Sequence, residues 1–299
     1  MTGRWRHNVP LYAMLLPAVV LVAIFSYGPM VGIVIAFQNF IPAKGSLFAS
    51  DWVGWKNFEY VYNLPTTGQV IWNTFFISIM KIVANLAVPI LTALLLNEVR
   101  KKLFKRTLQT IIYFPHFLSW VILSGILIDV LSPNGGIANQ FLGFFGVNGI
   151  YFLGNENWFP FVLVGTDVWK EFGFNTIVFL AALTGINPAL YESAVVDGAS
   201  RWKQTIYITL PGIMPIIVLM ATLSVGNVLN TGFDQVFNLY SPSVYSTGDI
   251  IDTFVYRTAL INAQFAVATA FGLFKSVVSL VLLSTAYLLA YRLANYRIF

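Results

Sequence analysis

The sequence predicts an all-α membrane protein with six transmembrane helices and both termini in the cytoplasm. Hydrophobic residues make up 58% of the 299 positions and charged residues only 10%, whereas a soluble domain has roughly 25% charged residues. Six apolar segments reach the length of about 20 residues that a helix needs to cross a bilayer. Basic residues are concentrated between those segments on one side, which sets the expected orientation.

The six expected spans form a single domain that comprises residues 1–299. They cover residues about 10–37, 69–97, 107–131, 159–184, 206–230 and 264–291. The first span is longer than the apolar core of a signal peptide, about 7 to 15 residues, so we expect it to stay in the mature protein. Pro115 and His116 interrupt the third span, where we expect a kink and a hydrogen-bonded histidine.

The distribution of lysine and arginine predicts which side of the membrane each connection faces. The expected cytoplasmic side carries eleven basic residues, namely Arg4, Arg6, Arg100, Lys101, Lys102, Lys105, Arg106, Arg201, Lys203, Arg292 and Arg297. The other side carries three, namely Lys44, Lys56 and Arg257. The positive-inside rule therefore places both termini and the segment 187–205 in the cytoplasm. The position of the basic residues beside the membrane spans accounts for the net charge of +5. We therefore expect no nucleic-acid partner.

Residues 187–205 differ from the apolar spans around them because they carry helix-capping residues and charges. Asn187 is a suitable N-cap, and Pro188 falls at the first helical position, where its missing N–H costs nothing. Gly198 can take the left-handed conformation that ends a helix, and Ser200 can cap a second helix. We therefore expect two short exposed helices joined by a tight bend.

This segment and the start of the next span resemble the EAA loop of binding-protein-dependent ABC importer permeases, whose pattern is E-A-A, three residues, G, nine residues and I-x-L-P. The matching positions are Glu192, Ala194, Gly198, Ile208, Leu210 and Pro211, while Ser193 replaces the first alanine and Asp197 precedes the glycine. In the family this loop docks in a groove of a cytoplasmic ATPase. The resemblance therefore implies that these eight residues couple the chain to the ATPase, and that residues 187–205 are the cytoplasmic coupling loop. The alternative is an amphipathic helix lying on the membrane surface.

The resemblance covers nearly the whole chain from about Pro10 onward. The runs YFPHFLSW (113–120), LSPNGGIANQFLG (131–143), DVWKEFGFNTIVFLAAL (167–183) and AFGLFKSVVSL (270–280) are similar to the carbohydrate branch, and in particular to the LplB-type polysaccharide and oligosaccharide permeases. The resemblance implies the type I importer fold, an inner-membrane location, a second permease subunit that would complete a heterodimer, and two ATPase subunits that hold ATP and Mg²⁺. It also implies an extracytoplasmic solute-binding protein that delivers an oligosaccharide. The three expected outer loops, residues 38–67, 132–158 and 231–262, either dock that protein or only cap the helix ends.

The chain lacks the parts needed to drive transport or catalysis by itself. It has no G-x-x-x-x-G-K-[ST] phosphate loop and no soluble segment long enough for a nucleotide-binding domain. Its two histidines, His7 and His116, cannot form a metal cluster, and the absence of cysteine excludes thiolate chemistry. We therefore expect no catalytic residue, no metal and no cofactor on this chain. An ion gradient is the alternative energy source, but a gradient-driven carrier needs no docking loop.

Polar residues within the spans are the candidates for a solute pathway, because an ionisable group facing lipid costs at least ~2.5 kcal/mol. The candidates are Asn73, Ser78, Lys81, Asn85, Asp167, Trp169, Lys170, Glu171, Asn227 and Lys275. The alternative is that such residues only make hydrogen bonds between helices. Lys170 can neutralise one neighbouring carboxylate while the other finds a different partner, and Trp169 can stack on a sugar ring.

Lys81 has no acidic residue within its own helical turn, so we expect a lone cation in the pathway. Such a cation suits an anionic solute, and importers of alginate and pectin fragments occur in the branch that the chain resembles. We therefore hypothesise a uronate-containing oligosaccharide. The alternative is a permease of the same superfamily for a peptide or an amino acid.

Overall fold

A computed structural model describes residues 2–147 and 149–294 of the chain, which fold almost entirely into helices. These residues form two compact units. The first comprises residues 2–64 and Val255–Phe274, and the second comprises Pro65–Phe254 and residues 275–294.

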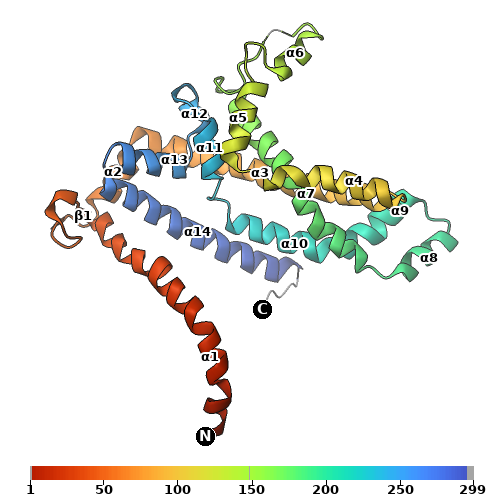
Figure 1. Cartoon of the computed structure of the whole chain (residues 1–299), viewed down its shortest axis with the longest axis horizontal. Helices are drawn as coiled ribbons and strands as arrows, with labels where there is room; N and C mark the ends of the chain where they lie inside the picture. The colour runs from red at the N-terminus through yellow and green to blue at the C-terminus, as the bar shows by residue number, and fades with distance from the viewer. Residues whose placement is uncertain (1, 148, 295–299) are drawn as a thin grey trace. The chain divides into compact units, whose positions relative to one another are not determined.

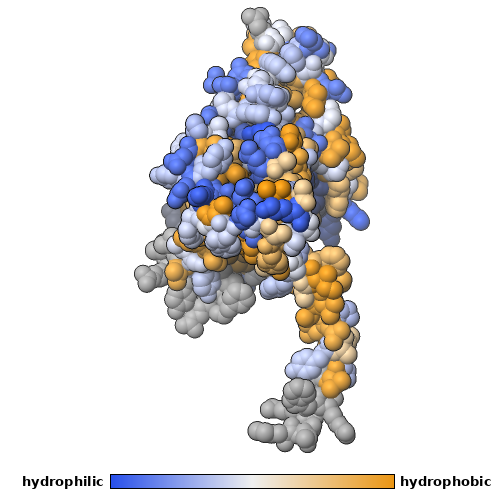
Figure 2. Space-filling model, turned by 90° about the vertical axis from the view of Figure 1, so that its left-hand side faces the viewer, coloured by the Kyte–Doolittle hydropathy of each residue, from blue (hydrophilic) through white to orange (hydrophobic). Residues whose placement is uncertain are grey.

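The first unit begins with a long apolar helical stretch. It consists of α1 (Thr2–Val22), a π-helical turn (Ala23–Tyr27) and a 3-10 helix (Gly28–Phe37). Side chains from Val9 to Val31 are exposed, and the surface of this helical stretch in Figure 2 is largely hydrophobic. Lipid is the medium that suits such a surface, since a helix satisfies its backbone hydrogen bonds internally.

The aromatic segment after this helix is folded rather than extended. Strands β1 (Gln38–Asn39) and β2 (Asp51–Trp52) pair in antiparallel register, and α2 (Lys56–Asn63) follows. The side chain of Asn57 donates to the carbonyls of Ala36 at 2.8 Å and Gln38 at 2.9 Å, which fastens α2 to the hairpin. The unit also contains a 3-10 turn, Pro42–Lys44, and a π-helical turn, Arg257–Ile261.

The second unit is built around α3 and α7, which lie side by side, with α4 and α10 packed against α7 (Figure 1). Its helices are α3 (Pro65–Glu98), α4 (Lys102–Tyr113), α5 (Trp120–Val130), α6 (Ile137–Gly143), α7 (Phe159–Thr184), α8 (Pro188–Val196), α9 (Arg201–Gln204), α10 (Leu210–Gly226), α11 (Phe233–Leu239) and α12 (Tyr245–Gly248). Helices α13 (Ile251–Tyr256) and α14 (Phe265–Ala294) each have residues in both units.

Six membrane spans can be counted among the described residues. Four are helical stretches long and apolar enough to cross a bilayer, namely Val9–Phe37, Pro65–Glu98, Arg201–Gly226 and Phe265–Leu288. Two more are bent pairs, Lys102–Phe117 with Trp120–Val130 and Phe159–Thr184 with Pro188–Val196. The number six is therefore reached if each bent pair is counted as one span, and the expected bounds remain a prediction. The local structure departs from the expectation in two places.

The first departure is in the third span, which is not one helix. Helix α4 ends at Tyr113, a 3-10 turn follows, and α5 starts after Ser119 at an angle of 103° to α4. Pro115 has no N–H to donate and disfavours helical geometry in the residue before it. The Ser119 hydroxyl then accepts from the N–H of Ile122 at 3.3 Å and caps α5. The expected kink is thus a sharp break.

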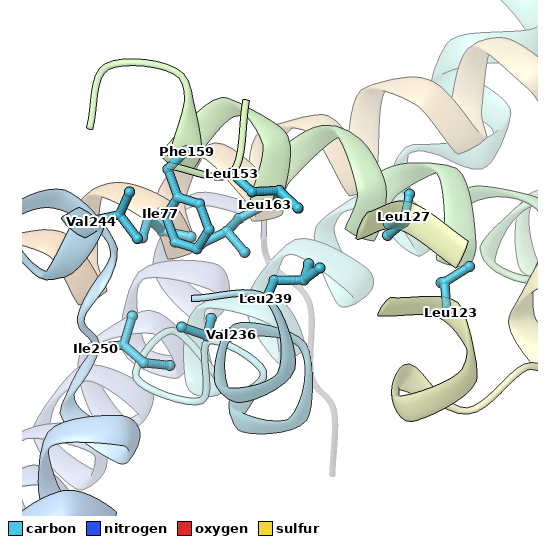
Figure 3. Close-up of a cluster of buried hydrophobic side chains, with 10 residues drawn as sticks. All are labelled: Ile77, Leu123, Leu127, Leu153, Phe159, Leu163, Val236, Leu239, Val244 and Ile250. Carbon is cyan, nitrogen blue, oxygen red and sulfur yellow. The ribbon is translucent and has the colours of Figure 1, made fainter. Parts of the chain in front are cut away.

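The second departure concerns residues 231–262, which are largely helical and packed rather than an open loop. They contain α11, α12 and α13, and Val236 and Leu239 of α11 are buried in the main core of the second unit. That core brings together side chains from distant segments (Figure 3), namely Ile77, Leu123, Leu127, Leu153, Phe159, Leu163, Val236, Leu239, Val244 and Ile250. Helix α11 is too short to cross a bilayer, so a length criterion overlooks it.

Gly173 allows α7 to approach the end of α4 closely. A Cβ at this position would clash with the backbone carbonyl of Ile112, which cannot swing aside as a side chain can. We expect Gly173→Ala to destabilise the protein by at least about 1–3 kcal/mol, the range for overpacked sites. The thermal midpoint of the purified protein in detergent measures this.

Gly165→Ala is the matched control, because it lies in the same helix and nothing stands within 4 Å of its added Cβ. It should leave the midpoint unchanged or raise it, since alanine favours a helix interior by up to about 1 kcal/mol. Equal midpoints for the two variants would show that the α4–α7 contact does not need glycine.

Candidate functional site

A polar cavity of about 360 Å³ lies among α3, α7, α10 and the turn after α10. Amides and hydroxyls predominate among the polar groups of its wall. The lining residues are Ser78, Lys81, Ile82, Asn85, Asp167, Glu171, Asn175, Met220, Leu223, Ser224, Asn227, Asn230, Thr231 and Gly232. A wall of this composition suits a ligand rich in hydroxyl groups, because each asparagine both donates and accepts hydrogen bonds.

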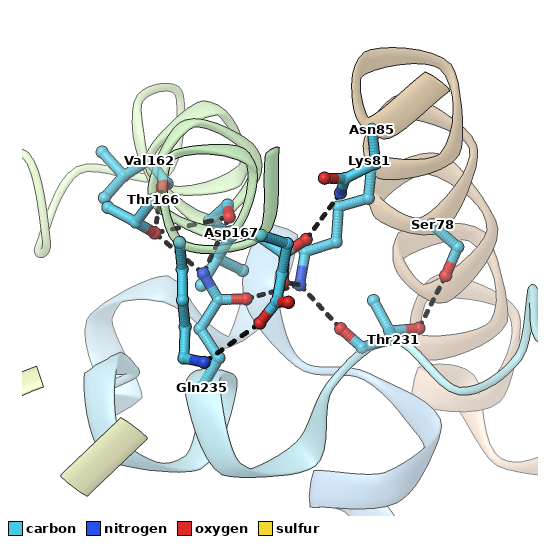
Figure 4. Close-up of polar contacts among 11 residues, drawn as sticks. Ser78, Lys81, Asn85, Val162, Thr166, Asp167, Thr231 and Gln235 are labelled. Carbon is cyan, nitrogen blue, oxygen red and sulfur yellow. Dashed lines mark hydrogen bonds and ion pairs between the residues drawn. The ribbon is translucent and has the colours of Figure 1, made fainter. Parts of the chain in front are cut away.

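Lys81 is the centre of a hydrogen-bond network beside this cavity (Figure 4). Its Nζ donates to Asp167 Oδ1 at 3.1 Å, to the carbonyl of Thr231 at 2.8 Å and to Gln235 Oε1. An ammonium group has three N–H donors, so all of them are used. The expectation of a lone cation is therefore wrong, since the partners come from helices that lie far from Lys81 in the sequence.

Asp167 is the counter-ion of Lys81, and the pair is largely withdrawn from solvent. The exposed fractions of the two side chains are 8% for Lys81 and 16% for Asp167. The second carboxylate oxygen of Asp167 accepts from the side-chain amide of Asn85 at 2.9 Å. Burial of an ion pair requires such additional hydrogen bonds, because both charges lose their hydration.

Gln235 and Thr231 complete the network from the segment that the sequence had assigned to an outer loop. The Gln235 amide donates to the Leu163 carbonyl and to the Thr166 hydroxyl, both at 2.8 Å. The Thr231 hydroxyl lies 2.7 Å from that of Ser78. No local pattern marked Gln235 or Thr166. Their roles depend on how α11 packs.

A second charged cluster lies at the break between α4 and α5. The Nδ1 atom of His116 lies 2.7 Å from Glu171 Oε2, and Lys170 Nζ lies 3.0 Å from Glu171 Oε1. Lys170 also donates to the His116 carbonyl at 2.8 Å. As expected, Lys170 pairs with one of its neighbouring carboxylates, and Asp167 finds its partner elsewhere.

The structure brings six of the ten pathway candidates to the cavity wall, namely Ser78, Lys81, Asn85, Asp167, Glu171 and Asn227. Four others are not among the lining residues. Asn73 donates to the carbonyls of Ser246 at 3.1 Å and Asp249 at 3.3 Å, which holds the backbone beside α12.

The other three candidates away from the wall are Trp169, Lys170 and Lys275. Lys275 pairs with Asp252 at 2.5 Å, and Lys170 belongs to the cluster at the α4–α5 break. Trp169 is exposed on the surface of α7. The ion pairs of Lys170 and Lys275 fit the interhelical alternative, and the role of Trp169 in the pathway stays a prediction.

The coupling loop has the local structure that its capping residues predict. Asn187 Oδ1 accepts from the N–H of Ala189 at 3.0 Å, and the Ser200 hydroxyl accepts from that of Lys203 at 3.4 Å. Gly198 lies between α8 and α9 with φ at +72°, the left-handed conformation that glycine adopts without strain.

The surface of this loop is exposed and partly apolar. Glu192, Ser193, Asp197 and Gly198 are exposed, and Val196 and Trp202 are 87% and 73% exposed. Arg201 forms an ion pair with Glu98 at the end of α3, while Ile208, Leu210 and Pro211 lie in the π-helical turn Thr205–Thr209 and the start of α10. An uncovered surface of this kind fits a docking element.

The described residues contain no group of three or more His, Asp or Glu side chains placed to hold a metal. The cavity therefore offers hydrogen-bonding groups and one neutralised ion pair. A helical membrane protein with such a cavity among its spans, and with an exposed loop at a helix end, has the features of a transport permease.

The chain belongs to the family of binding-protein-dependent transport system inner membrane components, whose sequence pattern matches residues 85–296. Its fold is the type I ABC importer permease fold. Two curated relatives come from Bacillus subtilis (strain 168). The polygalacturonan/rhamnogalacturonan transport system permease protein YteP is 43% identical over 94% of this chain and 87% of its own length. Protein LplB is 38% identical over 91% of this chain and 86% of its own length.

Two solved structures share the fold over nearly the full length. One is a bacterial ABC transporter that imports the acidic polysaccharide alginate, with a TM-score of 0.89 and 39% identity over 96% of this chain and 97% of that chain. The other is a bacterial alginate ABC transporter in complex with an alginate pentasaccharide-bound periplasmic protein, with a TM-score of 0.90 and 38% identity over 98% of both chains. This chain is accordingly a permease subunit of the inner membrane, the non-catalytic component of an ABC importer.

Proposed function

We propose that this permease imports acidic, uronate-containing oligosaccharides into the cytoplasm by alternating access. The observation that carries the proposal is the agreement between independent relatives. YteP is named for polygalacturonan and rhamnogalacturonan, and the solved transporters are named for alginate. Polygalacturonan, rhamnogalacturonan and alginate are all polymers with uronate units, although they differ in their sugars.

The side-chain amides in the cavity wall, rather than a free charge, are the feature that favours a carbohydrate solute. Asn85, Asn175, Asn227 and Asn230 all line it, and side-chain amides can bind vicinal hydroxyls as donor and acceptor. Lys81 adds no support for an anion in this structure, because its three donors are already taken. The acidic class is therefore supported by the relatives alone.

Two observations support the partners that we propose, namely the exposed coupling loop and the solved alginate transporters. A solute-binding protein is supported by the alginate transporter solved with its periplasmic protein. Two ATPase subunits holding ATP and Mg²⁺ would dock on Glu192, Ser193, Ala194, Asp197 and Gly198 of the coupling loop, and a second permease would complete the pathway. The proposed orientation, with both termini in the cytoplasm and residues 1–299 as one transmembrane permease domain, places the coupling loop on the same side as ATP.

Purification of the tagged chain from native membranes in mild detergent tests the partners. We expect an ATPase and a second permease to co-purify, and recovery of this chain alone, under conditions that preserve other membrane complexes, would contradict the proposal. The solute class is then tested on the solute-binding protein of the system. We expect it to bind short oligogalacturonate or alginate oligosaccharides more tightly than neutral oligosaccharides of the same length, and binding of neutral sugars only would exclude the acidic class.

A further inference from the structure

A continuous helical stretch connects the coupling loop to the rim of the cavity. Helix α9, the π-helical turn and α10 together form the span Arg201–Gly226, which is roughly 39 Å long at about 1.5 Å per residue. It begins at Arg201, three residues after Gly198, and ends before the cavity-lining turn 227–232. Because the stretch is helical throughout, we expect a displacement at the coupling loop to be carried to the turn at the other end.

That turn is fastened to α3 by two polar contacts. Lys81 Nζ donates to the Thr231 carbonyl at 2.8 Å, and the hydroxyls of Ser78 and Thr231 lie 2.7 Å apart. The next residue is Gly232, whose φ of +92° is a conformation that side chains disfavour. A Cβ there would lie 3.4 Å from Lys81 Nζ, so glycine lets the turn come this close to the lysine.

The same turn is fastened to α7 through Gln235. The Gln235 side chain is fully buried, and it accepts from Lys81 while it donates to the Leu163 carbonyl and the Thr166 hydroxyl. Lys81 thereby joins α3, α7 and the chain after α10 at a single nitrogen atom.

Ser78, Lys81, Thr231 and Gly232 also line the cavity. Water or a solute hydroxyl in the cavity can therefore replace the hydrogen bonds that are lost when the turn moves away. An interlocked apolar contact has no such substitute. These contacts thus suit a joint that opens and closes rather than a permanent one.

We infer that Ser78, Lys81 and Gln235 form a polar latch that holds the turn 230–232 against α3 and α7, and that the latch releases when the coupling loop moves α10. The inference rests on the proposed transport function, since it assigns one of the steps by which the cavity opens. Ser78, Lys81 and Gln235 are positioning residues in this step.

A disulfide that replaces one contact of the latch tests this inference. The chain has no cysteine, so the variant Ser78→Cys/Thr231→Cys carries a single pair of thiols. The two native hydroxyl oxygens lie 2.7 Å apart, so we expect the two thiols to meet and to form a disulfide under oxidant. In the complete importer, we expect oxidation to reduce ATP-driven uptake to background and reductant to restore it. The two single-cysteine variants should not respond to oxidant. Unchanged uptake with the disulfide formed would overturn the latch, whereas a reduced complex that transports no acidic oligosaccharide would count against the proposed solute.

A second measurement needs no solute. Asn230→Cys places a thiol on the turn, and its labelling rate with a charged thiol reagent reports how open the turn is. Adding Gln235→Met should accelerate labelling in the resting complex, whereas adding Gln140→Met, which removes an exposed glutamine bonded to the Gly135 carbonyl, should not. Equal labelling rates in the three proteins would contradict the latch even if the disulfide variant failed to assemble.

Discussion

Lys81→Met is expected to destabilise the protein by about 3–5 kcal/mol, the usual cost of removing one partner of a buried ion pair. Asp167 would keep its hydrogen bond from Asn85 but lose its counter-ion, in a position where its side chain is only 16% exposed. The Thr231 carbonyl and Gln235 would each lose a donor as well. The thermal midpoint of the purified complex, followed by size-exclusion chromatography after heating, measures the loss.

The double variant Lys81→Met/Asp167→Asn separates the charge from the rest of the network. It removes the uncompensated carboxylate, and its new amide can still bond to Asn85, so we expect most of the lost stability to return. Uptake should stay impaired, because the donors of the polar latch are still missing. A double variant as unstable as Lys81→Met would show that the ion pair is not the main contribution of Lys81.

Gly198→Asp is expected to abolish transport while the chain still inserts and folds. The residue sits at the bend of the coupling loop with φ at +72°, and nothing stands within 4 Å of an added Cβ. The conformational cost is therefore limited to about 1–2 kcal/mol, and aspartate tolerates this region better than most residues. A charged side chain at the bend would instead obstruct the ATPase groove that we propose. ATP-driven uptake and the amount of assembled complex are the two measurements.

Gly45→Asp is the matched control for this variant. Gly45 has the same φ of +72° and the same open surroundings, but it lies in the loop between β1 and β2. It should carry the same strain and retain transport. If both variants lost transport to the same degree, backbone strain would explain the effect and the docking role of Gly198 would fail.

The local features of the fold could be predicted because each depends on a few neighbouring residues. Asn187, Pro188, Gly198 and Ser200 define the ends of α8 and α9 through capping and backbone preference, and the structure has both helices in place. The break at Pro115 follows from its missing N–H in the same way. The six spans follow from length and hydrophobicity.

The partners of the cavity residues could not be predicted from such local signals. Lys81 meets Asp167 and Gln235 because of the rotation and packing of α3, α7 and α11. Hydrophobic periodicity does not determine these rotations, since several faces of a membrane helix are apolar. Asp167 could equally have paired with Lys170, which instead bonds to Glu171. Gln235 stands in a helix too short to be recognised as a membrane element, so nothing near it in the sequence indicated its burial.

Uptake by proteoliposomes tests the central claim most directly. The complex purified through this chain is reconstituted and supplied with its solute-binding protein and a labelled short uronate oligosaccharide. We predict uptake that requires enclosed ATP and the binding protein, and that a neutral oligosaccharide of equal length does not inhibit. Uptake driven by an ion gradient without ATP would contradict the assignment as an importer driven by ATP, and ATP-dependent uptake of neutral sugars alone would contradict the acidic solute.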